Sequence, residues 1–436
     1  MKQKMLNMIV YFLYDVLLLL ATPIIIGYHL FRSLTRGRPV ALFERFGFLP
    51  SDQKGKIAGF DTIWVHAVSV GETIAVKTLL KAIKERFPQK KIVLSNVTET
   101  GRSISLKLAE ADLCIYFPFD YGFAARRAIS SVSPSLIIIV ETEIWPNFLR
   151  AARKCNVPVI LANGRISDKS FKSYNRLKWV FRRVLRDFSA LCMQTQEDAR
   201  RIISMGAQSS RVYVSKNLKY DVPVAGISQQ RFRELRDEYL IPQSLTVITA
   251  GSTHQGEEEL LAQIYRNLMA DERNLLLVLA PRHPERVEKV SEILQKEGIP
   301  CALRSKLDAR TTPFRCGEVL VLDTVGELTK LYSISDLVFV GGSLVPVGGH
   351  NVLEPAALHV PVLFGPFMNN FKEIAALILK FKGGVQVANE AELEQALRSL
   401  LDDEDRRREM GRNGARLLEE NSGSTERHME IIASFI

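Results

Sequence analysis

Carboxylates follow two of the most apolar runs in the chain, at positions where a side chain could do acid–base chemistry. Glu72 comes after the turn in IWVHAVSVGE and opens an amphipathic stretch, and Glu141 and Glu143 follow the apolar run that ends in VETEIWPN. A carboxylate at the end of a buried strand can serve as a general base. Ser69 and Glu72 also have the spacing of a capping box, in which both side chains bond the start of a helix. The sequence therefore leaves two roles open for Glu72, helix cap and base.

Glu141 and Glu143 lie close together in the sequence, and Lys219 is a further candidate functional residue. Strand alternation predicts that Glu141 and Glu143 point to opposite sides of their element. We therefore expect one of them to face a ligand and the other to cap the helix that begins near Pro146. Lys219, in NLKYD, follows the last strand of the first half of the chain. A lysine there is a candidate for binding negative charge, and a solvated surface lysine is the alternative.

A glycine-rich segment in the second half, GGSLVPVGGHNVLEP, has the composition of a ligand loop between a strand and a helix. Free backbone amides at a helix N-terminus suit a phosphate group. The segment ends in His350, Asn351 and Glu354, and a carboxylate there suits ribose hydroxyls, which need an acceptor. The alternative is a loop with a demanding backbone conformation and no ligand.

Two other loops of the second half carry candidate ligand-binding residues. APRHPER presents Arg282 and His283 between a strand and a helix, and an arginine at that point can pair with phosphate. TVGELTKLY places Gly326 and Glu327 at the start of another helix. Taken alone, Glu327 would be an ordinary acidic residue of a first helical turn.

The elements that must position these loops are strands that alternate with helices. Two doubly wound α/β domains are predicted, because the strand-like runs form two series with a linker near 216–240 between them. The predicted strands are 62–67, 92–95, 136–140, 157–161, 190–193 and 211–214, then 245–250, 275–279, 318–321, 337–340 and 360–364. Two helices near 390–420 are expected to close the chain. Ligands bind at the carboxyl ends of such strands, so we expect the polar loops to face one central cleft between the domains.

Motifs for several other kinds of chemistry are missing from the sequence. No G-x-G-x-x-G follows the first strand and no G-x-x-x-x-G-K-[ST] occurs, which argues against a dinucleotide site and a P-loop. The five cysteines show no C-x-x-C spacing, which argues against a disulfide framework or a zinc site. The length of 436 residues and the hydrophobic share of 47% indicate a globular protein of two domains.

The apolar stretch from Met8 to Leu30 predicts an uncleaved membrane anchor. A helix of this length can span a bilayer, which needs about 20 residues, although Asp15 and Pro23 lie inside the stretch. A signal peptide and a buried domain helix are the alternatives. Arginines follow the stretch directly, and the positive-inside bias then keeps the rest of the chain on the cytoplasmic side.

The charge of the chain indicates an anionic partner, because the formal net charge is +10. One predicted helix, 172–186, concentrates basic residues together with aromatic ones. Its members are Lys172, Arg176, Lys178, Trp179, Phe181, Arg182, Arg183 and Arg186. Beside a membrane anchor, such a helix suits docking on an anionic lipid surface, and a solvated helix face is the alternative.

Six motifs occur in the order seen in one enzyme family. HAVSVGE, ETEIWPN, NGRIS, GSTHQGEE, PRHPER and GGSLVPVGGHNVLEP together resemble the 3-deoxy-D-manno-octulosonic acid (Kdo) transferases of bacterial lipid A assembly. The resemblance covers nearly the whole chain, including the anchor. It implies two Rossmann-like domains of the GT-B glycosyltransferase kind. It also implies transfer of Kdo from CMP-Kdo to a lipid A precursor, lipid IVA, with inversion, in lipopolysaccharide assembly.

The resemblance implies a role for each matching residue. Glu72 matches the catalytic base of the family, and Glu141 and Lys219 match positions that stabilise the transition state. The positions that match the CMP contacts are Pro281, Arg282, Val325, Gly326, Glu327, Asn351, Val352, Leu353 and Glu354. CMP-Kdo is a substrate, so no cofactor is implied. A metal is not expected either, because CMP has no diphosphate that a metal would need to neutralise.

Two positions depart from the pattern of the family. Many relatives have alanine where Gly164 stands and proline where Val352 stands. We expect Val352 to contact CMP through its backbone only, so that the change has no effect there. Gly164 could alter the acceptor side.

The predicted division is an anchor at 1–31, an acceptor-binding domain at 32–220 and a CMP-sugar-binding domain at 221–436. The predicted partners are CMP-Kdo, a lipid A precursor and an anionic membrane surface, with no nucleic acid. The catalytic domains are expected on the cytoplasmic side of the bacterial inner membrane. Two other classes remain open at this point: an enzyme that uses a UDP-sugar, such as an epimerase, and a non-enzymatic membrane receptor for an acidic ligand.

Overall fold

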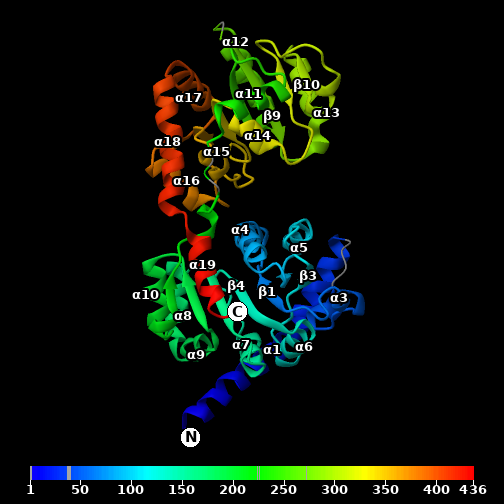
Figure 1. The fold of residues 1–436 in the computed structure, drawn as a ribbon, viewed down its shortest axis with the longest axis vertical. Helices are drawn as coiled ribbons and strands as arrows, with labels where there is room; N and C mark the ends of the chain where they lie inside the picture. Colours follow the sequence, from blue (N-terminus) through cyan, green and yellow to red (C-terminus); the bar gives the residue numbers. More distant parts are fainter. Residues whose placement is uncertain (1, 37–40, 223, 225, 272) are drawn as a thin grey trace. The chain divides into compact units, whose positions relative to one another are not determined.

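The computed structural model describes residues 2–36, 41–222, 224, 226–271 and 273–436, and its contacts divide the chain into two compact units (Figure 1). The first unit is Met1–Asp221 together with Ser422–Ile436, and the second is Val222–Asn421. Each unit holds one seven-stranded parallel sheet with helices packed on it. The predicted fold class, two Rossmann-like doubly wound domains, is confirmed.

The sheet of the first unit has the order β3-β2-β1-β4-β5-β6-β7, and each neighbouring pair is parallel. Its strands are β1 Thr62–His66, β2 Lys91–Asn96, β3 Leu113–Tyr116, β4 Pro134–Val140, β5 Val159–Gly164, β6 Ala190–Met193 and β7 Val212–Val214. The strands β1 and β5 are buried along their whole length, which is typical of a parallel sheet covered on both faces.

Helices cover both faces of this sheet. The apolar residues of α6, α7 and α10 form a core on one face, and those of α4 and α19 form a core on the other. The helices of the unit are α1 Lys2–Arg36, α2 Leu42–Arg45, α3 Ser51–Gly55, α4 Val70–Arg86, α5 Glu99–Ser105, α6 Gly122–Val132, α7 Pro146–Lys154, α8 Asp168–Arg176, α9 Lys178–Val184, α10 Gln196–Ser204 and α19 Ser424–Ala433, with the 3-10 turns η1 Leu185–Asp187, η2 Ser209–Arg211 and η3 Leu218–Tyr220.

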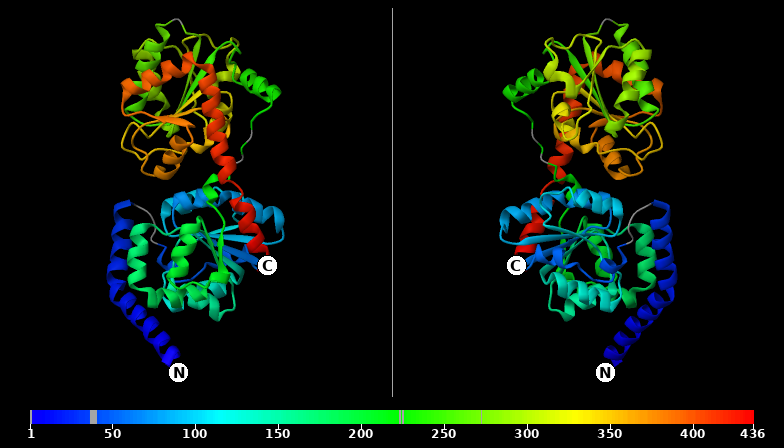
Figure 2. Two further views of the ribbon diagram at one scale, coloured as in Figure 1. Left: turned by 90° about the vertical axis from the view of Figure 1, so that its left-hand side faces the viewer. Right: turned by 90° about the vertical axis from the view of Figure 1, so that its right-hand side faces the viewer.

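The first helix, α1, packs against the first unit. Tyr14 Oη donates to Asp120 Oδ2 (2.8 Å), and Asn147 Nδ2 donates to Asp15 Oδ1 (2.6 Å). Figure 2 shows α1 beside α6, with its N-terminal end projecting beyond the sheet. Within the described residues, Tyr11–Tyr28 is the one helical window long and apolar enough to cross a membrane, judged by length and composition. The acid that weakened the anchor prediction, Asp15, therefore has a partner on α7.

The second unit repeats the architecture with the order β10-β11-β9-β8-β12-β13-β14, again with parallel neighbours. Its strands are β8 Thr246–Thr253, β9 Leu275–Pro281, β10 Cys301–Leu303, β11 Val319–Val321, β12 Leu337–Val340, β13 Val362–Phe364 and β14 Gly384–Gln386. Its helices are α11 Gln229–Glu238, α12 Glu257–Met269, α13 Val287–Lys296, α14 Leu328–Ser333, α15 Leu353–Ala357, α16 Lys372–Lys380, α17 Glu390–Asp402 and α18 Glu404–Asn421, with η4 Pro284–Arg286 and η5 Arg304–Ala309.

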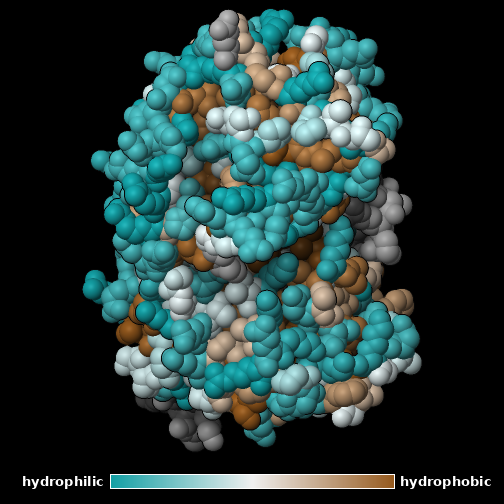
Figure 3. All heavy atoms as spheres, turned by 45° about the horizontal axis from the view of Figure 1, so that its top comes forward, coloured by the Kyte–Doolittle hydropathy of each residue, from teal (hydrophilic) through white to brown (hydrophobic). Residues whose placement is uncertain are grey.

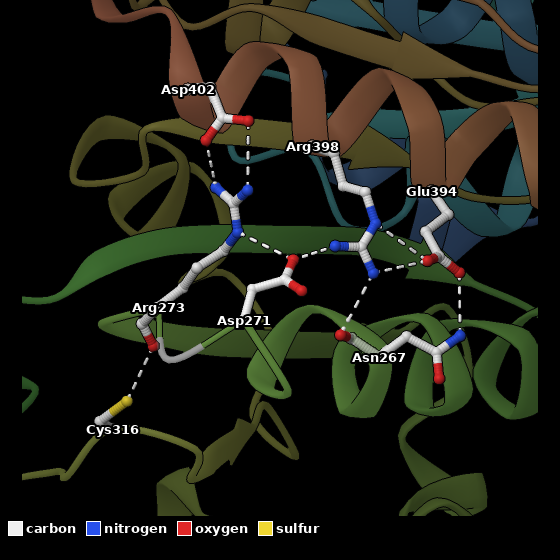
Figure 4. Close-up of polar contacts among 7 residues, drawn as sticks. All are labelled: Asn267, Asp271, Arg273, Cys316, Glu394, Arg398 and Asp402. Carbon is white, nitrogen blue, oxygen red and sulfur yellow. Dashed lines mark hydrogen bonds and ion pairs between the residues drawn. The ribbon is translucent and has the colours of Figure 1, made fainter.

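A network of ion pairs joins the end of α12 to α17 (Figure 4). Arg273 Nη1 lies 2.7 Å from Asp402 Oδ1, and Arg398 Nη2 lies 2.8 Å from Glu394 Oε1. Arg398 also pairs with Asp271, which contacts Arg273 in turn. Because these carboxylates are partly exposed to solvent, each pair adds little stability alone, and together they fix the position of α17.

The surface is uneven in polarity. The face in Figure 3 is mainly hydrophilic, with hydrophobic residues in small groups. In contrast, many large apolar side chains of α1 are exposed. They include Phe12, Leu17, Leu19, Leu20, Ile24 and Phe31. Exposed apolar side chains in this number suit an apolar partner.

The structure differs from the sequence interpretation mainly in short elements. The strands β3, β10 and β14 are missing from the predicted set, because runs of three or four residues give no clear periodicity. The predicted linker 216–240 is wrong in its second half, where Ser228 caps α11 and Leu235 packs into the core. The predicted second domain ran to residue 436, whereas Met429 and Ile432 of α19 pack on the first unit. The segment 1–31, predicted as a separate anchor, is grouped with that unit too.

Candidate active site

Glu72 lies in the first turn of α4, directly after β1. Its Oε2 accepts a hydrogen bond from Val68 N (2.5 Å), and its Oε1 accepts one from Ser69 Oγ (3.0 Å). The predicted capping box is not formed, because the Ser69 hydroxyl donates to the carboxylate and accepts no helix amide. The turn brings the amide of Val68 to the carboxylate instead. Glu72 is therefore buried and held by the residues just before the helix.

The environment of Glu72 suits proton transfer at neutral pH. Burial raises the pKa of Glu72 to about 7, and the neighbouring Glu141 carboxylate adds to that increase. The hydrogen bonds from Val68 and Ser69 and the charge of Lys219 oppose it. A carboxyl group with a pKa near the working pH is the form in which a general base is most effective.

Glu141 and Lys219 lie beside this carboxylate. Lys219 Nζ, in η3, is 3.3 Å from Glu141 Oε1, and each side chain is about one-third exposed. Glu141 has a φ of 59°, and a non-glycine residue in this region stores strain of about 1–3 kcal/mol. The parent strands β1 and β4 are neighbours in the sheet, so Glu72 and Glu141 follow adjacent carboxyl ends. The structure thus gathers the three predicted catalytic residues in the first unit, and their roles stay predictions.

Glu143 joins the same cluster, which contradicts the alternation argument. The strand β4 ends before Glu141, whose left-handed backbone breaks the alternation of side chains. Burial raises the pKa of Glu143 to about 7, and the charges of Glu72 and Glu141 raise it further. The prediction that one acid of this pair caps the following helix is wrong as well. Asp120 takes that role, accepting from two amides in the first turn of α7 (3.1 and 2.7 Å).

In the second unit, two predicted nucleotide contacts from different loops lie close together. Pro281 ends β9, and the exposed Arg282 follows it, with its backbone N–H donating to Thr253 O (3.0 Å). Burial raises the pKa of Glu354, while the hydrogen bond from Asn351 and the charge of Arg282 oppose this. The charge of Arg282 therefore acts on the Glu354 carboxyl near the carboxyl ends of β9 and β12.

Asn351 organises the turn that leads to Glu354. Its Oδ1 accepts from Leu353 N (3.1 Å), and its Nδ2 donates to Glu354 Oε1 (3.2 Å). The side chains of Val352 and Leu353 are fully buried, so a ligand could reach these two residues only through their backbone atoms. The helix α15 has five residues, which leaves little dipole for the phosphate site expected at its start.

The expectation of free amides in the glycine-rich loop is wrong for its first part. Glu257 of α12 is fully buried and accepts hydrogen bonds from the backbone N–H groups of Gly342 (2.7 Å), Ser343 (3.0 Å) and Leu344 (3.0 Å). It also accepts one from His254 N (2.9 Å). A carboxylate of the chain itself therefore fills the anion position of this loop. This contact has no signal in the sequence, because 85 residues separate Glu257 from Gly342.

The third predicted nucleotide segment, Val325 to Glu327, has its own partners. Val325 is 86% exposed and Gly326 has a φ of 93°. Glu327 Oε1 accepts from Tyr239 Oη (3.1 Å) and from Arg304 Nε (3.1 Å). Burial would raise the pKa of Glu327, but these partners and Thr324 hold it below its usual value. No hydrogen bond joins this segment to Arg282 within the part of the chain that the structure describes.

Gly164 ends β5 in a tightly packed place. A Cβ atom there would lie 2.8 Å from Met193 Sδ and 2.9 Å from Leu161 Cδ2. Both neighbours are side chains that can move, so the alanine of many relatives requires repacking of Met193. The structure therefore relates this departure to core packing.

The basic segment 172–186 is not the single helix that was predicted. It forms α8 and α9, which are separated at Leu177 (φ −106°, ψ 26°). Five of its cations and one aromatic residue are exposed, namely Lys172, Arg176, Lys178, Trp179, Arg182 and Arg186. Phe181 instead packs against Tyr174, with 4.5 Å between the ring centroids.

A cavity of about 470 Å³ lies between α1, α6 and α7. Apolar and basic side chains both line it, together with the carboxylate of Asp15. They include Phe12, Val16, Leu19 and Phe123, and Arg126, Arg150 and Lys154. This combination has the chemistry of a site for an amphipathic anion.

Metal ligands are not grouped in the described ranges. Among these residues, no set of three or more His, Cys, Asp or Glu side chains is arranged to hold a metal ion. The expectation that no metal is required stays a prediction.

Sequence comparison places the chain among known proteins. The family described as 3-deoxy-D-manno-octulosonic-acid transferase (kdotransferase) matches residues 41–222. A 3-deoxy-D-manno-octulosonic acid transferase of Haemophilus influenzae is 33% identical, with 98% of each chain covered. The chain belongs to this family. A second Kdo transferase, from Chlamydophila psittaci, is 28% identical over 98% of this chain and 96% of the relative.

Several solved structures have the same fold as this chain. The UDP-GlcNAc 2-epimerase of Neisseria meningitidis, solved with UDP-GlcNAc bound, covers 86% of this chain and 100% of its own, with a TM-score of 0.55 at 13% identity. A putative UDP-N-acetylglucosamine 2-epimerase of Listeria monocytogenes gives a TM-score of 0.52 at 12% identity, covering 86% of this chain and 96% of its own. At these identities the likeness shows the fold alone, which is of the GT-B kind. The chain is a Kdo-transferring glycosyltransferase by family.

Proposed function

We propose that this Kdo transferase moves Kdo from CMP-Kdo to a lipid A precursor with inversion at the anomeric carbon. The observation that carries the proposal is the cluster of Glu72, Glu141 and Lys219, in which a buried carboxyl with a pKa near 7 lies beside an ion pair. A receptor for an acidic ligand would gain nothing from a buried acid poised to exchange protons. This cluster therefore favours catalysis over binding alone.

The proposed reaction is a single displacement. Glu72 takes the proton of an acceptor hydroxyl, and that oxygen forms a bond to the anomeric carbon. The bond from this carbon to the phosphate oxygen of CMP breaks on the opposite face, and CMP leaves with the electron pair. Lys219 compensates negative charge as it develops, which is the role that charged and polar groups have in transition-state stabilisation.

The donor is assigned to the second unit. Arg282 suits the single phosphate of CMP, and Glu354 with Asn351 suits the ribose hydroxyls, because carboxylate and amide oxygens accept hydrogen bonds. One phosphate beside an arginine needs no metal, so we expect activity to persist in excess EDTA.

The acceptor is assigned to the first unit. A lipid A precursor carries phosphates and acyl chains, and α1 with its neighbouring cavity offers basic and apolar side chains together. The same features suit an anionic membrane surface. We place the catalytic units on the cytoplasmic side of the bacterial inner membrane, in lipopolysaccharide assembly.

The experiment that tests the proposal is incubation with CMP-Kdo and tetra-acylated lipid IVA, with product masses as the readout. The expected product is heavier by one or more Kdo residues, and Glu72→Gln protein should give at least about 100-fold less of it within the same time. Thermal unfolding with CMP or UDP added separates the alternative enzyme class. Protection by UDP and not by CMP would contradict the donor assignment and favour a UDP-sugar enzyme.

A further inference from the structure

Three of the seven histidines of the chain gather at one edge of the second sheet. His254 follows β8, His283 follows β9 and His350 follows β12. These strands are neighbours in the order β9-β8-β12. The next strand in the sequence, β9, lies on one side of β8, and the later strand β12 lies on the other side. The strand order therefore reverses between β8 and β12. Ligands of doubly wound sheets bind at such a point.

Two of these histidines form a direct pair. His254 Nε2 lies 2.9 Å from His350 Nε2, and the two rings are nearly parallel, with an interplanar angle of 6°. His283 stands edge-on to His254 at 5.7 Å between centroids. A Cβ atom on Gly342 would lie 3.0 Å from His350 Cδ2 and 3.3 Å from His254 Cδ2. The two rings therefore rest against a position where only a glycine leaves room for them.

The pair can hold one extra proton and no more. A hydrogen bond between two Nε2 atoms needs a donor and an acceptor, so one of the two rings must keep an unprotonated Nε2. The other ring is then either neutral or an imidazolium. No hydrogen bond to either Nδ1 atom is present among the residues described by the structure, so each ring keeps a nitrogen for a ligand.

Burial and the cations near the pair favour its neutral form in the absence of ligand. Burial lowers the pKa of His350 to about 4, and the charges of His254, Arg282 and His283 act in the same direction. Burial also lowers the pKa of His254, with help from His283, Arg286 and Arg282 and against the opposing charge of Glu257. An anion bound here would offset these cations and favour protonation.

We propose that the His254–His350 pair takes up a proton when the negatively charged nucleotide binds beside it, so that donor affinity is coupled to pH. The inference rests on the proposed function, since it takes CMP-Kdo or its product CMP as the anion. The pair would then act as a positioning and charge-matching element next to Arg282. One imidazolium Nδ1–H donates to the anion, and the Nε2 hydrogen bond keeps the two loops together.

The test uses calorimetric titration of the full-length protein with CMP at pH 7.5, in buffers with different ionisation enthalpies. The phosphate of free CMP is already a dianion there, because its second pKa is about 6, so CMP brings no proton and any uptake comes from the buffer. We expect net proton uptake on CMP binding and none on binding of cytidine. We also expect the affinity for CMP to fall as the pH rises from 6.5 to 8.5.

Variants locate the proton. His254→Gln and His350→Gln should each abolish the uptake and weaken CMP about tenfold or more, as for a lost hydrogen bond to a charged group. His359→Asn is the control, because His359 lies in the same unit outside the cluster and its φ of 61° is one that asparagine tolerates. This control should bind CMP with the same uptake as the wild type.

The outcomes separate this inference from the proposed function. If wild-type protein does not bind CMP, the donor assignment itself fails and the inference fails with it. CMP binding without proton uptake overturns the inference and leaves the function standing. Uptake that survives in both glutamine variants, or that disappears in His283→Gln alone, shows that the proton goes elsewhere and also overturns it. Should one glutamine variant unfold, the other still tests the location of the proton, and a lack of uptake by the wild-type protein overturns the inference in any case.

Discussion

Glu72 meets two demands with one side chain. Its carboxylate fixes the turn before α4 through Val68 N and Ser69 Oγ, and the burial that comes with this position raises its pKa to about 7. The structural position would thus support the proposed role as a base, because a more exposed carboxylate would have a lower pKa and would be a weaker base. Glu72 therefore holds the turn without forming the predicted capping box, and this structural role is compatible with the proposed role as a base.

The substitution Glu72→Gln separates these roles. A glutamine oxygen can still accept from Val68 N, so the variant should fold and bind CMP. It cannot take a proton at neutral pH, so transfer should fall about 100- to 10,000-fold, as when a general base is lost. Single-turnover transfer from CMP-Kdo measures the loss. A folded variant with transfer near the wild-type rate would leave Glu72 with the structural role only.

The stability of the same variant should also depend less on pH. The folded protein holds the Glu72 proton up to about pH 7, whereas the unfolded chain releases it near 4.5. Between these values the folded state binds more protons, so this group lowers wild-type stability as the pH rises. The thermal midpoint should therefore fall less from pH 5 to pH 8 for the Glu72→Gln variant than for the wild-type protein.

The two members of the ion pair next to Glu72, Lys219 and Glu141, should shift the pKa of Glu72 in opposite directions. Lys219 lowers the pKa of Glu72 and Glu141 raises it, so Lys219→Gln should move the acidic limb of the pH–activity profile to higher pH. Glu141→Gln should move it to lower pH. The profile of kcat/KM measures both shifts, whatever the loss in rate. Two shifts of the same sign would show that this limb does not report Glu72.

The sequence predicted which residues would meet at the strand ends, but it did not predict their immediate contacts. Glu72 and Glu141 were found because polar residues after apolar runs mark the carboxyl edge of a parallel sheet, whereas Lys219 was selected mainly through the family resemblance. Glu257 and Asp120 were missed as partners of the loops, because each bonds amides that are distant in sequence. Glu143 was misplaced because a left-handed residue before it cannot be seen in a periodic pattern.

At the scale of elements, one carboxylate holds the glycine-rich loop in shape. Glu257 bonds three consecutive amides of that loop and one of the loop after β8. It thereby links the first turn of α12 to the segments that carry His254 and His350. A loop that would be mobile on its own is fixed before any ligand arrives.

The substitution Glu257→Gln should therefore weaken both stability and CMP binding. A glutamine presents an N–H₂ group to buried N–H donors, and leaving such donors unsatisfied costs about 1–3 kcal/mol each. Thermal unfolding and CMP titration measure the two effects. Glu259→Gln is the matched control on the same helix, where the carboxylate bonds only Gly256 N on the surface (3.0 Å). Equal behaviour of the two variants would contradict the structural role of Glu257.

The helix α1 is an element with two different sides. Its tyrosines and Asp15 bond the first unit, while large apolar side chains remain exposed beside the basic residues of α7. Removing the helix would therefore also remove partners of Asp120, a buried carboxyl whose pKa burial raises to about 7. Charge variants test lipid binding with less disturbance than a deletion.

The double substitution R150Q/K154Q should weaken binding to vesicles that contain anionic lipid. Each basic group near such a surface contributes about 1 kcal/mol, so the loss should reach roughly tenfold or more. Binding to zwitterionic vesicles should not change. Lys77→Gln on α4, which packs on the other face of the sheet, is the control. Equal binding by all three proteins in a vesicle sedimentation assay would exclude this surface as the lipid contact.

At the scale of the whole molecule, the fold could be predicted from the sequence, but the path of the chain through it could not. Two series of alternating strands and helices predicted two doubly wound units, because the spacing of apolar residues differs between each strand and the helix that follows it. The return of α19 to the first unit rests on Met429 and Ile432, two residues of a short amphipathic helix. From the sequence alone, a short amphipathic helix could pack on either unit.

Residues 222–421 should fold alone and bind CMP, because this segment is continuous and has its own cores. Calorimetric titration and thermal unfolding of the isolated segment measure this, with CMP affinity expected within a few-fold of the full-length value. The variant Arg282→Ala of the same segment is the control and should bind more weakly. A segment that folds but does not bind CMP would move the donor site out of the second unit.

The path of the chain also sets an order of events during synthesis. The last helix carries His428, whose Nε2 accepts from Asn163 N, and Ser424, whose Oγ donates to Lys216 O just before the turn that holds Lys219. Ser424 stands 208 residues beyond Lys216, so α19 is synthesised after the whole of the second unit, Val222–Asn421. The turn that carries Lys219 therefore lacks this support until the second unit has been made. Although most of the first unit is synthesised first, we expect its folding to be completed after synthesis of the second unit, and not in the order of the sequence.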